Sequence, residues 1–354
     1  MKKNLHLQSP LQTSIDSIWN QQNINLIDVR SPGEFQDGTI PGAINIPLLD
    51  DLERSLVGTL YKQYGQDKAV NKGYELLEPK VTAFLDFFAR LPGDRKIAVF
   101  CARGGMRSQV IVSFLNSNGY KAEQVSGGYK LFRKWNLEKL EQFTLQYPII
   151  LHGRTGVGKT LVLEQLENAL DLEGLARHRG SMFGAVGKNP VSQKTFEAEL
   201  LKKLQSLDNT IPVYIEGESR KIGNVTLPGN LFKQMKSAIA VLLDSSIETR
   251  ARRTVEEYID KQPDAKGDIR DIILKLEKDL GKKGVQKLLL EFDKGAYQAC
   301  FQDILLSYYD KKYGFSMKEL TYELTVSSED IKKAAKEINA HFEASKHQRL
   351  SRHD

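Results

Sequence analysis

Cysteine is scarce in this chain, which has only Cys101 and Cys300 among its 354 residues. Two cysteines cannot build a disulfide framework, and they do not make a zinc site. No apolar run approaches the ~20 residues of a membrane span. The polar start MKKNLHLQSPLQ lacks the apolar block of a signal peptide. These absences exclude a disulfide-rich secreted scaffold, and we expect a cytoplasmic protein with no membrane partner.

The overall composition is that of an ordinary globular protein, with 40% hydrophobic and 27% charged residues and only 11 prolines. The length favours two domains. The net charge of +6 permits binding of a polyanion such as RNA but is too small to require it. We expect Cys300, within the helical-looking run YQACFQDIL, to be a buried structural residue.

Residues 99–108, with the sequence VFCARGGMRS, bring one cysteine into a loop rich in glycine and arginine. An apolar strand precedes the cysteine and a helical run follows it. At such a turn, backbone N–H groups, the positive end of the helix dipole and the arginines all favour thiolate over thiol. The sequence therefore predicts a catalytic cysteine in an anion-binding loop, made of Cys101, Arg103, Gly104, Gly105, Arg107 and Ser108.

Short apolar strands alternate with helical patterns on both sides of this loop. This alternation predicts a small parallel sheet covered on both faces. Residues 48–78 are less regular and carry no clear prediction. Strands are expected at residues 24–30, 96–100 and 122–125, a turn followed by a further strand within residues 39–47, and a helix at residues 79–91.

These residues resemble the rhodanese family over roughly residues 12–135. The match rests on IDVRSPGEF, IPGAINIP, the cysteine loop and the run GGY that ends at Tyr129. The resemblance implies a persulfide- or selenide-carrying cysteine at Cys101. It also implies that Asp28 and Arg30 support the loop rather than react.

The cysteine loop departs from the usual sulfurtransferase pattern, because five residues separate Cys101 from Arg107. This is the Cys-x5-Arg spacing of phosphatases related to rhodanese by fold. The longer loop widens the ring of N–H donors and suits a tetrahedral oxyanion such as phosphate, thiophosphate or selenophosphate. A phosphatase is therefore a rival interpretation, although the loop offers no acidic residue to protonate a leaving group.

A complete phosphate-binding P-loop motif is present in the second part of the chain, after the rhodanese-like segment. The segment GRTGVGKT, residues 153–160, comes directly after the apolar run PIIL and precedes an apolar helix. The glycines let the backbone close around phosphate oxygens, the lysine supplies a charge, and the threonine can hold Mg²⁺. The predicted diphosphate ligands here are Gly153, Gly156, Gly158, Lys159 and Thr160.

Further polar residues follow later strands of this second half. Glu216 and Glu218 come at the end of an apolar strand, where an acid orients magnesium or an attacking group, and we expect Thr160 and Glu216 to hold Mg²⁺. Two polar loops add Arg179, Ser181 and Arg220 to the predicted diphosphate site. The basic run at residues 248–253 has two possible interpretations: its arginines bind phosphate, or they form a solvent-exposed helix face.

The sequence thus predicts an α/β chain: a small parallel-sheet rhodanese domain, then a P-loop NTPase-like α/β domain with a helical C-terminal region. We place the first domain at residues 1–136, a linking helix at 137–147 and the second domain at 148–354. Residues 320–326 are expected to add an edge strand, and residues 340–354 to form a frayed basic tail.

This fusion of a rhodanese module with a P-loop module resembles the bacterial tRNA 2-selenouridine synthase family over essentially the whole chain. The resemblance implies replacement of sulfur by selenium in wobble 2-thiouridine of the tRNA anticodon arm, with selenophosphate as donor. It also implies geranyl diphosphate as a second substrate, S-geranyl-2-thiouridine as the intermediate and a selenophosphate-supplying enzyme as a transient partner. No tightly bound cofactor is implied.

Two other functions remain open. One is a rhodanese-type sulfurtransferase fused to an ATP-dependent kinase-like or ATPase domain. The other is a regulatory nucleotide-binding protein whose rhodanese module only binds partners, although an intact Cys101 argues against it. Competition between geranyl diphosphate and ATP for the Lys159 loop separates the first of these from the tRNA-modifying enzyme.

Overall fold

The computed structural model describes residues 10–312 and 320–350, and the side chains up to residue 343. The chain divides into two compact units, Met1–Lys139 and Leu140–Asp354. Within the described residues, no helix is long and apolar enough to cross a membrane.

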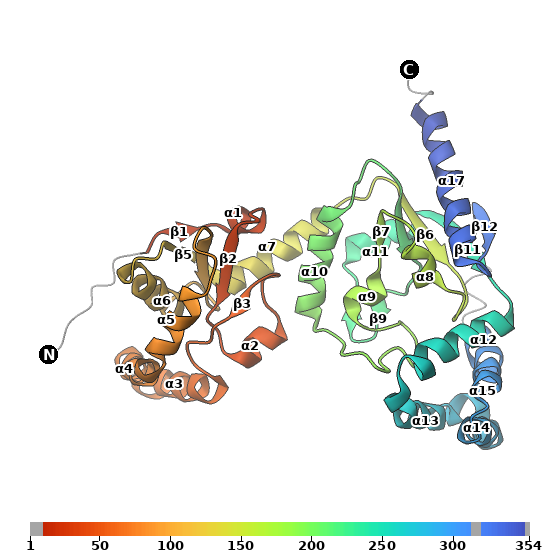
Figure 1. The fold of residues 1–354 in the computed structure, drawn as a ribbon, viewed down its shortest axis with the longest axis horizontal. Helices are drawn as coiled ribbons and strands as arrows, with labels where there is room; N and C mark the ends of the chain where they lie inside the picture. Colours follow the sequence, from red (N-terminus) through yellow and green to blue (C-terminus); the bar gives the residue numbers. More distant parts are fainter. Residues whose placement is uncertain (1–9, 313–319, 351–354) are drawn as a thin grey trace. The chain divides into compact units, whose positions relative to one another are not determined.

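A five-stranded parallel sheet in the order β1-β5-β4-β2-β3 forms the centre of the first unit (Figure 1). The central strands are apolar and buried, and Phe88, Val99, Ile111 and Leu115 pack in the core beside them. The strands are β1 (Gln12–Thr13), β2 (Ile24–Asp28), β3 (Ile44–Asn45), β4 (Lys96–Phe100) and β5 (Ala122–Val125). This is the parallel sheet that the alternating pattern predicted.

The helices of the first unit begin at residues that suit helix starts. Ser31 and Glu34 form a capping box ahead of α2, with Pro32 in its first turn, and Asp50 and Glu53 form another ahead of α3. The helices are α1 (Ile15–Trp19), α2 (Pro32–Asp37), α3 (Asp51–Tyr64), α4 (Gln66–Leu77), the 3₁₀ turn η1 (Glu78–Lys80), α5 (Val81–Ala89), α6 (Met106–Ser117) and α7 (Gly128–Gln142).

Two expectations for this half need correction. Residues 48–78 are mostly helical, because α3 and α4 fill the stretch that carried no prediction. No residue of α3 is buried, so no apolar stripe marks this helix in the sequence. The helix expected at 137–147 begins earlier and ends earlier, since α7 runs from Gly128 to Gln142.

A second five-stranded parallel sheet, in the order β12-β11-β6-β8-β7, lies at the centre of the second unit. Its middle strands bury Ile149, Leu151, Val241 and Leu243. The strands are β6 (Pro148–His152), β7 (Ala169–Leu170), β8 (Val213–Glu216), β11 (Ile239–Asp244) and β12 (Leu324–Ser327), with an antiparallel pair β9 (Lys221–Ile222) and β10 (Val225–Thr226) beside it. The expected edge strand is confirmed as β12.

The helices of the second unit cover this sheet and extend into a separate apolar cluster. Phe183, Tyr258 and Phe301 lie in that cluster together with Cys300, which is fully buried as expected. The helices are α8 (Lys159–Leu163), α9 (Leu172–Ala176), α10 (Gln193–Ser206), α11 (Gly229–Lys236), α12 (Ile247–Val255), η2 (Glu256–Asp260), η3 (Pro263–Ala265), α13 (Lys266–Lys275), α14 (Glu277–Asp293), α15 (Tyr297–Ile304), η4 (Leu305–Tyr309) and α17 (Ile331–Leu350).

The tail expected to fray at residues 340–354 is instead helical up to Leu350, as part of α17. Ala334, Ala335, Ile338 and Phe342 attach this helix to the sheet core, because their spacing places them on one face. Residues 351–354 lie outside the described residues.

Candidate functional site

The cysteine loop lies between the end of β4 and the start of α6. Cys101 is only 3% exposed, and its sulfur is surrounded by donors. The Gly105 N–H donates to Sγ over 3.3 Å, and the Ser108 hydroxyl donates to it over 3.2 Å. The loop thus places hydrogen-bond donors around the sulfur, as an anionic sulfur requires.

Competing effects set the pKa of the Cys101 thiol. Burial raises this pKa, whereas the Ser108 hydroxyl, the backbone N–H groups of Arg103 and Ser108, and the charge of Arg107 lower it. The result is a pKa below the ordinary value of a cysteine. Cys101 is therefore a thiolate over a wider pH range than a free cysteine, which makes it the stronger nucleophile near neutrality.

Gln124 of β5 organises this loop and was not singled out from the sequence. Its Nε2 atom lies 3.0 Å from Gly104 O, 3.1 Å from Gly105 O and 2.8 Å from Ser108 Oγ. Carbonyl oxygens only accept hydrogen bonds, so the atom facing them must be the amide nitrogen. The two N–H bonds of this amide are shared among the three acceptors, one of which is the Ser108 oxygen. The Ser108 hydroxyl in turn has two acceptors within reach, Cys101 Sγ at 3.2 Å and Gly105 O at 3.1 Å.

The predicted arginines of the loop have different surroundings. Arg107 is paired with Glu34 of α2, because Nη1 lies 2.7 Å from Oε2 and Nη2 lies 3.3 Å from Oε1. Arg103 is exposed. The sequence did not indicate this role for Glu34, although the residue lies within the segment that resembles rhodanese.

Asp28 and Arg30 form a buried pair next to the loop. The Arg30 guanidinium donates to the Asp28 carboxylate and to Gly38 O, and it lies 3.9 Å from the centre of the Tyr129 ring. The Tyr129 N–H donates to Cys101 O over 2.9 Å. This chain of contacts connects the pair to the backbone of the cysteine rather than to its sulfur.

The P-loop joins β6 to α8 in the predicted strand–loop–helix order. Gly156 has φ +81°, and a β-carbon there would lie 2.8 Å from the backbone oxygen of Arg250, so only glycine fits. Lys159 Nζ lies 3.5 Å from Gly153 O and 3.8 Å from a Glu218 oxygen. The lysine therefore faces the inside of the loop and an acidic group beside it.

Three carboxylates gather beside Lys159. Ligand atoms of Glu173, Glu216 and Glu218 all lie within 4.8 Å of one another, and Glu216 is fully buried. Burial raises the pKa of each of the three, and for Glu173 the nearby Glu218 charge helps to raise the pKa to about 8. The sequence predicted Glu216 and Glu218 here, but Glu173, which comes from α9, carried no signal.

This cluster fits a magnesium ion by its chemistry. Thr160 Oγ1 lies 3.5 Å from Glu216 Oε2, so the two predicted metal ligands are neighbours. Hydroxyl and carboxylate oxygens are the donors that Mg²⁺ prefers, together with phosphate oxygens. A cation would also offset the mutual repulsion of three buried carboxylates.

The arginines of α12 are neither all exposed on a solvated helix face nor placed to bind phosphate directly. Arg250 is buried, donates to Thr155 O over 2.9 Å and pairs with Asp310 through both terminal nitrogens. Arg253 donates to Val157 O over 2.7 Å. These two arginines hold the P-loop backbone from outside, while Arg252 is the exposed one.

The remaining predicted ligands lie around this site with partners of their own. Arg179 pairs with Glu257, donates to Val186 O and lies over the Tyr258 ring. Ser181 Oγ lies 3.4 Å from the Tyr258 hydroxyl, and Arg220 is exposed. Their role as diphosphate ligands stays a prediction.

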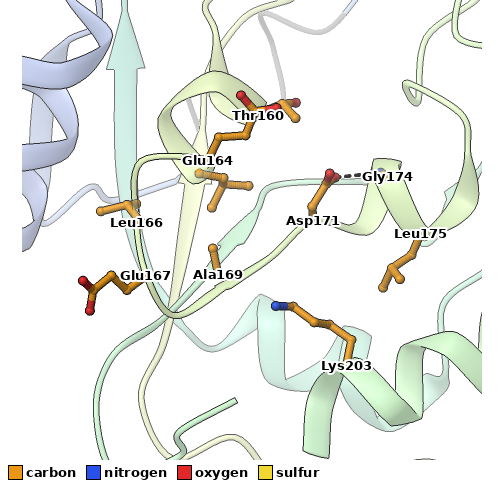
Figure 2. Close-up of a pocket in the computed structure, with 10 residues that line it drawn as sticks. Thr160, Glu164, Leu166, Glu167, Ala169, Asp171, Gly174, Leu175 and Lys203 are labelled. Carbon is orange, nitrogen blue, oxygen red and sulfur yellow. Dashed lines mark hydrogen bonds between the residues drawn. The ribbon is translucent and has the colours of Figure 1, made fainter. Parts of the chain in front are cut away.

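A cavity of about 340 Å³ adjoins the P-loop at Thr160 (Figure 2). Its apolar lining comes from Leu163, Leu166, Ala169 and Leu175, while Asp171 lies on the same side as Thr160. Glu164, Glu167, Gly174 and Lys203 complete the wall. The cavity has the size of a small-molecule site and a mainly apolar interior.

Comparisons with known proteins place these two sites in one family. The model of the tRNA 2-selenouridine synthase AAA domain matches residues 146–346, which is more than half of the chain. The chain belongs to the tRNA 2-selenouridine synthase family. A rhodanese-like domain model matches residues 12–135, so both resemblances seen in the sequence are confirmed, as is the predicted order of a rhodanese domain and a P-loop domain.

Curated members of the tRNA 2-selenouridine synthase family match over most of their length. The synthase of Hydrogenovibrio crunogenus is 34% identical over 330 residues, which are 84% of this chain and 90% of that protein. The synthase of Sulfurovum sp. is 40% identical over 247 residues, which are 68% of this chain and 67% of that protein.

Among solved structures, the N-terminal domain of an ATP/GTP binding protein from Clostridium difficile 630 is 36% identical to this chain. The match covers 35% of this chain and 96% of that domain, with a TM-score of 0.34. In this tRNA 2-selenouridine synthase family member, the cysteine loop lies in the rhodanese-like unit and the P-loop lies in the following unit.

Proposed function

We propose that this enzyme replaces the sulfur of wobble 2-thiouridine in tRNA by selenium, in two steps with S-geranyl-2-thiouridine between them. The observation that carries the proposal is that one chain of this family combines an activated cysteine loop with a separate P-loop. Geranyl diphosphate and selenophosphate are the proposed co-substrates.

The first step converts the thiocarbonyl sulfur of 2-thiouridine, which is a poor leaving group, into a thioether sulfur that can leave as a thiolate. The thiocarbonyl sulfur attacks C1 of geranyl diphosphate, a C–S bond forms, the C–O bond to diphosphate breaks, and the N3 proton of the uridine is lost to solvent. Lys159 and the P-loop N–H groups, with Arg179, Ser181 and Arg220 as proposed helpers, would stabilise the departing diphosphate. This is the electrostatic role that a P-loop has in phosphoryl transfer, used here on a diphosphate that is not part of ATP.

Magnesium is a proposed requirement of this first step. Thr160 and Glu216 would hold the ion, with Glu173 and Glu218 beside them. When bound, Mg²⁺ would neutralise charge on the diphosphate oxygens. Burial raises the pKa of all three carboxyls, and a bound cation would oppose this effect and favour their ionised forms.

The cavity beside Thr160 supports a substrate with a hydrocarbon group. It adjoins the P-loop residue that would hold the metal, and its apolar side chains suit an alkyl chain better than a sugar. Asp171 lies on the same side as Thr160, and Leu166 and Leu175 line the apolar part (Figure 2).

The second step uses the cysteine loop. Selenophosphate would bind with its oxygens at the loop N–H groups and Arg107. Selenium at the oxidation level of selenide then forms a bond to C2 of the uridine, and the C–S bond breaks to release geranylthiolate. With water, phosphate is the other product.

The proposed partners follow from this chemistry. The substrate is the anticodon arm of a tRNA bearing wobble 2-thiouridine, and the net charge of +6 is compatible with a polyanion. An enzyme that makes selenophosphate would supply the donor through a transient contact. We place the reaction in the cytoplasm, together with its tRNA substrate.

Mass spectrometry of the wobble nucleoside tests the proposal directly. Thiolated tRNA is incubated with the enzyme and geranyl diphosphate, and selenophosphate is added afterwards. We expect S-geranyl-2-thiouridine first and 2-selenouridine second. If ATP is hydrolysed at the Lys159 loop, geranyl diphosphate does not compete with it and no geranyl group reaches the tRNA, the sulfurtransferase–ATPase alternative holds instead.

A further inference from the structure

We propose that Cys101 attacks the phosphorus of the selenium donor, so that the cysteine takes the phosphoryl group and selenium leaves as hydroselenide. The cysteine loop would thus catalyse phosphoryl transfer, and its covalent intermediate would be phosphocysteine. This inference rests on selenophosphate being the donor, as proposed above.

The electron balance favours attack at phosphorus. In selenophosphate, selenium has the oxidation level of selenide and phosphorus that of phosphate. Moving a selenium atom onto a thiolate would give a selenosulfide, with selenium two electrons more oxidised, and would leave phosphite. Attack at phosphorus changes no oxidation state, because an S–P bond forms, the P–Se bond breaks and its electron pair leaves with selenium. The proton of monoprotonated selenophosphate ends on selenium, so the leaving species is hydroselenide. Water then cleaves the S–P bond, giving phosphate and the thiolate.

The backbone of the loop is arranged to receive a phosphoryl group. Gln124 Nε2 holds the carbonyl oxygens of Gly104 and Gly105, at 3.0 and 3.1 Å. With these acceptors occupied, N–H donors face the cysteine, and the Gly105 N–H already lies 3.3 Å from Sγ. The five residues between Cys101 and Arg107 give the ring the length that tetrahedral oxyanions need.

Arg107 has donors left for the phosphoryl oxygens. A guanidinium carries five N–H bonds, and Glu34 accepts from only one hydrogen on each of Nη1 and Nη2. The arginine side chain remains 25% exposed, so an anion can reach it. Glu34 therefore fixes the orientation of Arg107 without using all of its hydrogen-bonding capacity.

The lack of an acid in the loop also fits this chemistry. Residues 101–108 contain no carboxyl group. Glu34 is the carboxyl beside Arg107, and although burial raises its pKa, the hydrogen bond and charge of Arg107 bring the pKa below its ordinary value. Glu34 is thus ionised and cannot protonate a leaving group. Hydroselenide is a weak base that needs no such proton, whereas an alkoxide would need one.

Ser108 would assist both halves of the transfer. Its hydroxyl accepts a hydrogen bond from Gln124 over 2.8 Å and donates to Cys101 Sγ over 3.2 Å. The same donation stabilises the sulfur as attacking thiolate and as leaving thiolate. Loss of this hydroxyl should slow the hydrolysis of phosphocysteine and allow the intermediate to accumulate.

The first test follows both atoms of the donor on the full-length enzyme without tRNA. Phosphorus-32-labelled selenophosphate is mixed with the enzyme in the presence of an alkylating agent that traps free hydroselenide, and the protein is then denatured in alkali, in which the S–P bond is stable. We expect label on the Cys101 peptide, an amount of trapped selenide equal to this label plus the phosphate released by hydrolysis, and more label in Ser108→Ala. Cys101→Ser should carry no label and Cys300→Ala the wild-type amount. Selenium on Cys101 without phosphorus would overturn the proposal.

A second test does not depend on selenium. Aryl phosphates with weakly basic leaving groups are offered as substrates, and release of the phenol is followed by absorbance. We expect Cys101-dependent hydrolysis that falls by about a hundredfold or more in Arg107→Lys, because one oxyanion donor set is lost. Hydrolysis of aryl phosphates without any reaction with selenophosphate would count against the proposed function alone. If neither selenophosphate nor the aryl phosphates leave a phosphoryl group on Cys101, phosphoryl transfer by this cysteine is disproved.

Discussion

Glu34 Oε2 lies 2.7 Å from Arg107 Nη1, so this carboxylate pairs with the arginine whose charge lowers the pKa of Cys101. The two residues come from different helices, α2 and α6, and are 73 positions apart in the chain. The carboxylate holds the guanidinium in place and also competes with any anion that binds there.

Glu34→Gln should therefore strengthen binding of phosphate to the cysteine loop. The amide keeps the shape of the side chain but removes its negative charge, so we expect about tenfold tighter binding. The measurement is protection of Cys101 from iodoacetamide at increasing phosphate concentration, with Glu123→Gln as the control. Weaker protection in Glu34→Gln would mean that the carboxylate mainly positions Arg107.

The two cysteines should differ in their reaction with iodoacetamide. Thiolate forms as the pH rises through the pKa, which is lowered for Cys101 but raised for Cys300 to about 12 by burial. At neutral pH we expect Cys101 to react quickly and Cys300 only after denaturation. Peptide mapping by mass spectrometry measures both, and equal rates in the native protein would contradict the loop's effect on Cys101.

Cys101→Ala should abolish selenation and leave geranylation of thiolated tRNA intact. The reason is that only the second step uses the cysteine sulfur. Nucleoside mass spectrometry after each addition measures the two steps separately, with Cys300→Ala as the matched control. Loss of both steps in Cys101→Ala would reject this division of labour between the two sites.

Lys159→Ala should stop geranyl transfer. The lysine charge lies inside the P-loop, and loss of such an electrostatic donor lowers rates by about a hundredfold or more. The matched control is Lys202→Ala, which removes an exposed lysine of α10. Transfer of the geranyl group is followed on thiolated tRNA, and an unchanged rate in Lys159→Ala would rule out the P-loop as the diphosphate site.

Arg250→Met should destabilise the second unit. It removes the donor to Thr155 O and the bidentate partner of Asp310, a mostly buried carboxylate that keeps only the longer contact of 3.7 Å with Arg154. We expect the free energy of unfolding to fall by about 3 kcal/mol, as for other broken buried pairs. Arg252→Met, at an exposed position of the same helix, should change it by less than about 1 kcal/mol in urea titrations. Equal effects would show that the buried pair contributes little.

The sequence predicted the main strands because burial on both faces leaves continuous apolar runs. The strands β4, β6 and β8 all lie where such runs were seen. It did not predict α3, since an amphipathic pattern arises only where a helix face is buried, and none of the residues of α3 is. Its capping box of Asp50 and Glu53 was the available signal.

Some site residues belong to contiguous sequence motifs, whereas others contact the site only through the tertiary fold. Residues within the cysteine loop and the P-loop were identified because each motif is contiguous in sequence and its glycines and basic residues together form an anion-binding loop. Glu34, Gln124 and Glu173 are separated from their partners by long stretches of chain, and no local pattern marks their roles. They could not be assigned before the fold brought them together.

The sequence by itself determined the chemical groups: a cysteine among N–H donors, a lysine in a phosphate loop, and acids after a buried strand. The tertiary structure decided how these groups are held and charged. Gln124 contacts the Ser108 hydroxyl beside the sulfur, Glu34 pairs with Arg107, and buried carboxylates meet beside Lys159. The physical reason is that hydrogen bonds and charge interactions act over a few ångströms, so they depend on which distant residues the packing makes neighbours.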